Sequence, residues 1–161
     1  MRRLQKTIQE IGWTREVPRL AGSDPVTKAI AAMSDEEHHC VLVMDGDALA
    51  GIFTGRDFLD RVAAVRDDPA QVKLSSVMTP APRTLRPLDP VAYAINWMAL
   101  ERFRNVPIVD DLGRVLGVLT VWDVMRHLNE FFDEIDATPR LRMPQSDTSR
   151  VVSMIDIGGG E

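Results

Sequence analysis

Residues 51–57 read Gly-Ile-Phe-Thr-Gly-Arg-Asp, and residues 117–123 read Gly-Val-Leu-Thr-Val-Trp-Asp. Each stretch is an apolar run that ends in a threonine, with an aspartate three residues later. Further upstream, Asp-Pro-Val at 24–26 returns at 89–91, an offset of 65 residues. A period this long, with the same internal order in both copies, indicates a duplicated supersecondary unit.

Each copy predicts the same order of elements. The Asp-Pro pairs suit a helix start, because aspartate accepts N–H groups of the first turn and proline fits the first helical position. Apolar residues at helical spacing follow, and then two short apolar runs divided by turn residues, which predict a hairpin. The expected strands are 17–20, 40–44 and 49–53 in the first copy and 83–85, 106–109 and 115–119 in the second. The fold class is therefore α+β, with two strand–helix–strand–strand–helix repeats packed with pseudo-two-fold symmetry.

The repeats divide the chain into five segments. We expect a helical segment before the first repeat, a polar linker between the repeats, and a breaker-rich tail that is partly disordered. The expected segments are 1–16 (helical), 17–65 (first repeat), 66–76 (linker), 77–132 (second repeat) and 133–161 (tail).

Composition narrows the class of protein. The 161 residues are 45% hydrophobic and 27% charged, enough for one compact core, and no apolar run approaches the roughly 20 residues of a membrane span. A net charge of −5 argues against a nucleic-acid binder. The single cysteine, Cys40, excludes an intramolecular disulfide, and the basic N-terminus lacks the apolar stretch of a secretory signal. We expect a cytoplasmic protein with no nucleic-acid or membrane partner.

Thr54 with Asp57, and Thr120 with Asp123, are the candidate site residues, and their pattern has two interpretations. In the first, the threonine caps the helix and the carboxylate reaches back to the cap N–H. In the second, the helix start binds an anion, the hydroxyl donates to a phosphate or sugar oxygen, and the carboxylate accepts from the vicinal hydroxyls of a ribose. Capping and binding are compatible, so the sequence leaves both open.

Gly51 and Gly117 lie on the strand just before each Thr-x-x-Asp. A residue without a side chain allows a ligand to approach the backbone closely. Taken with the hydroxyl and the carboxylate, the pattern favours a site for a ribose and its phosphate.

The doubled unit resembles the cystathionine-β-synthase (CBS) domain, which occurs as tandem pairs, over roughly residues 17 to 132. The second copy carries the fuller pattern, with Met-Thr-Pro at 78–80 and Asn-Val-Pro-Ile-Val-Asp at 105–110 before its Thr-x-x-Asp. The first copy has Leu42 where Pro107 stands, and nothing equivalent to 78–80 before Val17.

The resemblance implies a regulatory module and not an enzyme. Tandem pairs of this family have two clefts, and many bind AMP, ADP, ATP or S-adenosylmethionine. By position, Thr54 and Asp57 would serve one cleft and Thr120 and Asp123 the other, the aspartates holding the ribose diol. The residues implied to line an apolar slot for the base are Val41 and Val43 in one repeat and Val106 and Ile108 in the other.

The two clefts differ in charge. Arg56 can offer a phosphate a bidentate guanidinium contact, or it can be an ordinary solvated residue of the helix start. The matching position is Trp122, which we expect in the core or at a dimer surface rather than as a platform that stacks on a base. By the same resemblance, the helices after Thr54 and Thr120 form the surface of a homodimer, and any regulated partner is a separate protein.

Neither a catalytic nor a metal site is expected. Adjacent strand residues point to opposite faces, so His38 and His39 do not easily ligate one ion, and Cys40 suits a buried position. No cofactor is required, and an adenine nucleotide is the expected effector. Two classes of function remain: a ligand sensor of this kind, or a structural module that dimerises or binds proteins without a nucleotide.

Overall fold

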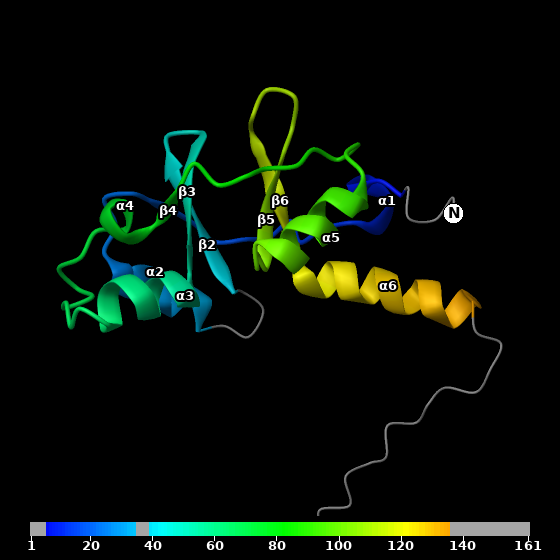
Figure 1. Cartoon of the computed structure of the whole chain (residues 1–161). Coiled ribbons are helices and arrows are strands. Elements are labelled where there is room, and N and C mark those ends of the chain that lie inside the picture. The colour runs from blue at the N-terminus through cyan, green and yellow to red at the C-terminus, as the bar shows by residue number, and fades with distance from the viewer. Residues whose placement is uncertain (1–5, 35–38, 136–161) are drawn as a thin grey trace, which may run out of the picture.

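The computed structural model describes residues 6–34 and 39–135, which form two similar halves side by side (Figure 1). The first half contains β1 (Arg19–Ala21), α2 (Val26–Met33), β2 (Cys40–Asp45), β3 (Ala48–Thr54), α3 (Gly55–Phe58), the π-helical turn Leu59–Ala63, α4 (Leu74–Val77) and β4 (Thr79–Pro80). The second contains α1 (Ile8–Ile11), α5 (Val91–Leu100), β5 (Asn105–Val109), β6 (Val115–Thr120) and α6 (Val121–Ile135). The α+β class and the tandem repeats are as expected.

The two halves share one strand order. In the first, β1 runs parallel to β2, and β2, β3 and β4 are antiparallel neighbours. In the second, the β5–β6 hairpin is flanked by single bridges: Leu85 pairs parallel with Ile108, and Thr14 pairs antiparallel with Val118. The strand expected at 83–85 is thus reduced to one bridge, because only Leu85 exchanges backbone hydrogen bonds with the hairpin.

Two short helices near the ends of the repeats are held by backbone hydrogen bonds, α4 to the first half and α1 to the second. Leu74 N donates to Asp24 O (3.0 Å), which fixes α4 to the first half. Ile8 N donates to Asp89 O (2.9 Å), which fixes α1 to the second half. Residues just before the boundary expected at 16/17 therefore pack with the second half, and residues just after the boundary expected at 76/77 pack with the first.

The helix starts differ in one respect from the sequence expectation. Pro25 and Pro90 are the residues before the first helical turn, and neither helix has a side-chain cap. Asp24 instead accepts from Ala21 N (2.9 Å), and Asp89 from Arg86 N (2.7 Å). The prediction that these aspartates cap the helices is wrong, because each closes the turn before the helix.

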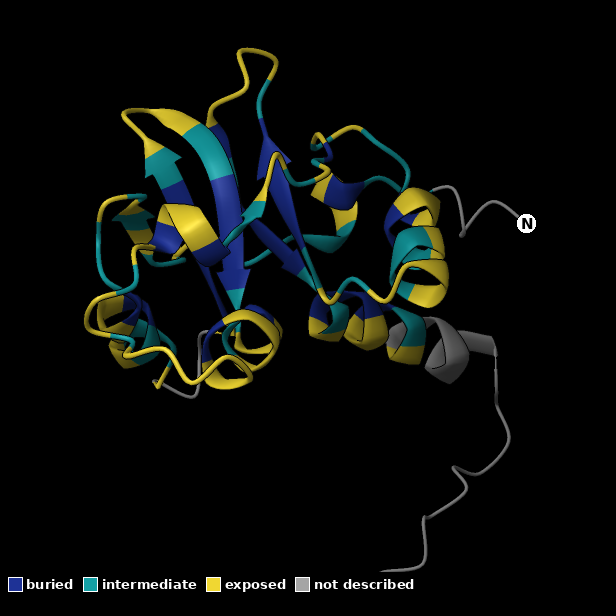
Figure 2. Ribbon diagram, turned by 60° about the vertical axis from the view of Figure 1, so that its left-hand side comes forward, coloured by how far each residue is buried: buried dark blue, intermediate teal, exposed yellow. Residues whose placement is uncertain are grey.

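Burial follows the two faces of each sheet. Val41, Val43 and Phe53 face the helices of the first half, whereas Cys40 and Leu42 face the opposite way. That opposite face meets the second hairpin, so a central core forms between the two sheets. In Figure 2 the strands are accordingly dark at the centre, and the helices are exposed on their outer faces.

Helix α6 continues to Ile135, beyond the boundary expected at 132, and residues 136–161 of the expected tail lie outside the described part of the chain. Within the described residues, no helix combines the length and apolar character needed to cross a bilayer.

Candidate functional site

Thr54 and Asp57 form a closed hydrogen-bonded cap at the start of α3. Asp57 Oδ2 accepts from both Thr54 N (2.9 Å) and Thr54 Oγ1 (2.7 Å), and Thr54 Oγ1 accepts a longer bond from Asp57 N (3.4 Å). Asp57 is only 7% exposed. The capping interpretation of the sequence is therefore correct for this repeat.

The second carboxylate oxygen of Asp57 holds two further groups. Thr79 Oγ1 donates to Asp57 Oδ1 at 2.8 Å, and Arg61 Nη1 forms an ion pair with the same oxygen at 3.2 Å. Arg61 also donates to the carbonyl of Val77 (2.9 Å). Asp57 thus links the end of the hairpin to the segment that leads into the second repeat.

Thr120 and Asp123 repeat the cap at the start of α6. Asp123 Oδ2 accepts from Thr120 N (2.9 Å) and Thr120 Oγ1 (2.7 Å), and Asp123 is 6% exposed. Its other oxygen, Oδ1, is held by Arg126 in place of a threonine. Both sites therefore have the cap on Oδ2 and an arginine on Oδ1, and at Asp57 the hydroxyl of Thr79 also donates to Oδ1.

The glycines before each site make room for the chain's own backbone. A Cβ at Gly51 would collide with the side chain of Met78 and lie 2.9 Å from Thr79 O. A Cβ at Gly117, where φ is +152°, would collide with Thr14 O and lie 2.7 Å from Trp13 Cδ1. The space expected for a ligand beside each glycine is therefore filled by residues 78–79 and 13–14.

These contacts also correct the comparison of the two copies. Thr79 pairs with Ile52 and Thr14 with Val118, the matching positions of β3 and β6. Trp13-Thr14 is thus the structural equivalent of Met78-Thr79, although the sequence analysis found no equivalent before Val17. The equivalence is hidden in the sequence because Trp13 and Arg15 replace Met78 and Pro80.

Arg56 and Trp122 both face solvent. Arg56 forms an ion pair with Asp60 at 3.4 Å, one turn further on, and its side chain is 73% exposed. Trp122 is 66% exposed, so it lies on the surface and not in the core. The structure brings Arg61, and not Arg56, to the carboxylate of Asp57.

The four residues expected to line a slot for the base are core residues. Val41 and Val43 lie in the core of the first half, and Val106 and Ile108 in that of the second, with exposures of 0–1%. Because they point toward the helices, a base reaches them only if the core opens. Their contact with a ligand stays a prediction.

Sequence reasoning did not find Arg61 and Thr79 at Asp57. Arg61 was in principle accessible, since it follows Asp57 by four residues and so shares its helical face. Thr79 was not, because its position depends on the pairing of β4 with β3.

Of the metal candidates, His38 lies outside the described residues, and the described residues hold no group of three or more His, Cys, Asp or Glu that could bind a metal.

The paired hairpins and matched Thr-x-x-Asp caps define a tandem-repeat module, and comparison identifies its family. The model of the CBS domain matches residues 14–64 and 74–130. The chain belongs to the CBS domain family, and it carries two copies. Domains of this family are generally regulatory modules.

Known proteins support the family and the fold. The meiotically up-regulated gene 70 protein of Schizosaccharomyces pombe is 32% identical over 120 residues, which cover 74% of this chain and 16% of that protein. Arabinose 5-phosphate isomerase KdsD of Francisella tularensis is 29% identical over 69% of this chain and 34% of its own length. The chain therefore spans only a minor part of these relatives.

Among solved structures, a protein with CBS domains from Burkholderia ambifaria superposes with a TM-score of 0.71 at 24% identity, covering 83% of this chain and 98% of that one. The hexameric CBS-CP12 protein of bloom-forming cyanobacteria has a TM-score of 0.66 at 27% identity, covering 74% of this chain and 66% of that one. These structures share the fold of the tandem pair.

Proposed function

We propose that this chain is a regulatory module that senses an adenosine-containing nucleotide at its two Thr-x-x-Asp ends. The observation that supports this most is the doubled cluster of a hydroxyl, a nearly buried carboxylate and an arginine at the end of each hairpin. A ribose hydroxyl needs an acceptor oxygen, and a phosphate needs N–H or guanidinium donors. Each cluster holds both kinds of group.

Binding at Asp57 requires an exchange of partners. Oδ2 is committed to the cap, so a ribose hydroxyl would compete for Oδ1 with Thr79 and Arg61. Displacing Thr79 loosens residues 77–79, and it frees the Arg61 guanidinium for a phosphate. This exchange would couple the ligand to the segment that joins the repeats, and the coupling is what a sensor requires.

We propose the first repeat as the stronger phosphate site. Arg56 lies in the first turn after Thr54 and Arg61 in the π-helical turn that follows, and the Arg56–Asp60 pair is exposed and long enough to exchange readily. The second repeat has Trp122 at the position of Arg56. The module acts as a homodimer in the cytoplasm and passes the signal to a separate regulated protein.

The direct test is thermal unfolding with AMP, ADP, ATP and S-adenosylmethionine, each at millimolar concentration. A ligand at 100 times its Kd adds about 2.7 kcal/mol to the free energy of unfolding, which raises the Tm by several degrees. If none of the four ligands shifts the Tm, the proposal fails.

The second candidate is a structural module that dimerises or binds proteins without a nucleotide. One observation favours it: all oxygens of Asp57 and Asp123 already have partners within the chain. It predicts unchanged Tm with every nucleotide and an intact dimer.

A further inference from the structure

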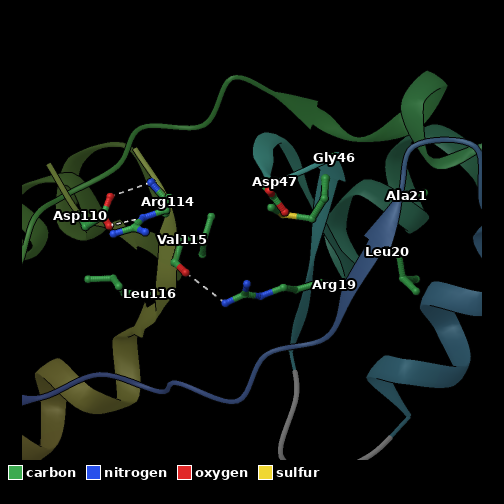
Figure 3. Close-up of a pocket in the computed structure, with 10 residues that line it drawn as sticks. Arg19, Leu20, Ala21, Gly46, Asp47, Asp110, Arg114, Val115 and Leu116 are labelled. Carbon is green, nitrogen blue, oxygen red and sulfur yellow. Dashed lines mark hydrogen bonds and ion pairs between the residues drawn. The ribbon is translucent and has the colours of Figure 1, made fainter. Parts of the chain in front are cut away.

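A separate cavity of about 780 Å³ lies between the turns of the two hairpins (Figure 3). It is lined by β1, the β2–β3 turn and the residues on both sides of the β5–β6 turn. In the first hairpin Asp45 pairs with Ala48 at the turn, and Cys40 pairs with Thr54 at the far end. The cavity is therefore at the opposite end of the sheet from the Thr-x-x-Asp cluster. Its volume lies within the range of small-molecule sites.

Two of its four charged side chains neutralise each other. Arg114 Nε donates to Asp110 Oδ2 (2.7 Å), and Asp110 Oδ1 accepts from Arg114 N (2.8 Å) and Leu112 N (2.9 Å). These bonds hold the pKa of the Asp110 carboxyl below its ordinary value, and the bond from the Arg114 backbone N–H has the largest effect. The pair is committed to the turn between β5 and β6.

The other two charges are not paired within the described residues. Arg19 reaches from β1 across the cavity, where Nη2 donates to Val115 O at 3.1 Å (Figure 3). This bond uses one of the five N–H donors of the guanidinium and fixes its position. Asp47, at the β2–β3 turn, has neither an ion pair nor a hydrogen bond among the residues that the structure describes. The cavity thus presents one guanidinium and one carboxylate to a ligand.

The cavity also has apolar walls. Met44 and Leu116 line it, and both are half-buried. The pseudo-two-fold axis relates Arg19 to Thr84 and Asp47 to Leu112, so the opposite edge of the molecule lacks this pair of charges. The combination of Arg19 and Asp47 is therefore a property of this one edge and not of the repeated fold.

We infer that this cavity is a binding site for the head group of an α-amino acid with an apolar side chain. Its carboxylate accepts from the free N–H donors of Arg19, its ammonium group donates to Asp47, and its side chain lies against Met44 and Leu116. A zwitterion satisfies both unpaired charges at once, whereas a simple anion would leave Asp47 unpaired next to its own negative charge. The inference does not depend on nucleotide binding at Thr54 or Thr120.

The test is isothermal calorimetry on the full chain without any nucleotide, using L-leucine, L-methionine and L-phenylalanine as probes. Two analogues separate the ends of the head group: N-acetyl-L-leucine lacks the ammonium charge, and L-leucinamide lacks the carboxylate. We expect saturable binding of at least one amino acid and at least tenfold weaker binding of the matching analogues.

Arg19→Gln and Asp47→Asn are each expected to weaken that binding at least tenfold. Both side chains are exposed, so both variants should fold, which a thermal melt verifies. Arg86→Gln is the matched control, since Arg86 is an exposed arginine on the opposite edge with its own partner, Asp111. No heat with any of the three amino acids, affinity unchanged in both variants, or equal binding of N-acetyl-L-leucine would each overturn the inference.

Discussion

Thr79 donates its hydroxyl to Asp57 Oδ1 at 2.8 Å, although the two residues belong to different repeats of the sequence. Arg61 contacts the same oxygen and also the backbone carbonyl of Val77. The aspartate of the first Thr-x-x-Asp therefore both caps α3 and holds the linker in place. In the second repeat Arg126 donates to Asp123 Oδ1, and Thr14, the equivalent of Thr79, contacts Val118 through backbone hydrogen bonds.

Replacing Thr79 by valine should lower the free energy of unfolding by about 1–2 kcal/mol, because it removes a part-buried hydrogen bond to a carboxylate. Thr79→Ser should retain most of the stability, since the hydroxyl remains. Urea unfolding measures both, and Thr27→Val, at an exposed position of α2, is the control. Equal stability of the wild type and Thr79→Val would mean that the bond contributes nothing in solution.

Gly117→Ala should be strongly destabilising. At φ +152° an alanine is strained, and its Cβ would collide with Thr14 O and with Trp13. Backbone strain and overpacking together suggest a loss of roughly 2–4 kcal/mol. Gly55→Ala is the matched control, because a Cβ there meets nothing within 4 Å. A Gly117→Ala protein as stable as Gly55→Ala would show that the crossing of residues 13–15 is not as close as described.

The sequence predicted the repeat well because its signals are local. The helical spacings, the short apolar runs, the turn residues and the Thr-x-x-Asp caps all depend on neighbours within a few positions. The hairpins and the caps at Thr54 and Thr120 appear in the structure where they were expected.

What the sequence could not show depends on long-range pairing. The exchange of α1 and α4 between the repeats rests on backbone bonds such as Ile8 N to Asp89 O. Gly51 and Gly117 were correctly singled out as places of close approach, but no local pattern tells a ligand from a crossing strand. In the same way, Val41 was correctly placed on a strand, and the face it occupies follows from packing between the sheets.

Cys40 should make stability depend on pH in the alkaline range. Burial raises the pKa of its thiol from 9.0 to about 12, so the unfolded chain loses this proton at a lower pH than the folded one. The contribution is complete below pH 9.0 and is lost as the pH rises toward 12, at up to about 1.4 kcal/mol per unit. Cys40→Ala should be less stable than the wild type at pH 7, and this difference should shrink between pH 9 and 11. A constant difference would mean that the thiol ionises equally in both states.

A homodimer should form through the helices that follow the two caps. In these helices Val62 and Val124 are buried in the two cores, but Leu59, Trp122 and Met125 are 53–66% exposed. We expect light scattering to give twice the 18.0 kDa of one chain, and Trp122→Lys to shift the mass toward the monomer. Leu112→Lys, which alters a leucine that is 77% exposed in the β5–β6 turn, should leave the dimer intact. A wild-type monomer at micromolar concentration contradicts the prediction.

The two Thr-x-x-Asp ends should differ in how strongly they bind a nucleotide. Asp57→Ala should weaken the affinity more than Asp123→Ala, because the first end has two arginines for the phosphate, Arg56 in the first turn after Thr54 and Arg61 in the next. A desolvated guanidinium contact contributes roughly 1.5–3 kcal/mol. Both variants also lose a cap, which costs about 1 kcal/mol of folding stability and must be separated from binding.

Asparagine at each position makes that separation, because its carbonyl oxygen still accepts the Thr54 or Thr120 N–H, whereas the NH2 group that replaces Oδ1 donates and no longer accepts from a ribose hydroxyl. We expect Asp57→Asn to lose most of the nucleotide affinity while the Tm of the free protein falls less than in Asp57→Ala. Calorimetry at one fixed salt concentration compares the four variants directly. If Asp123→Asn proves the more damaging to binding, the principal site lies in the second repeat, and Arg126 takes the role proposed for Arg61.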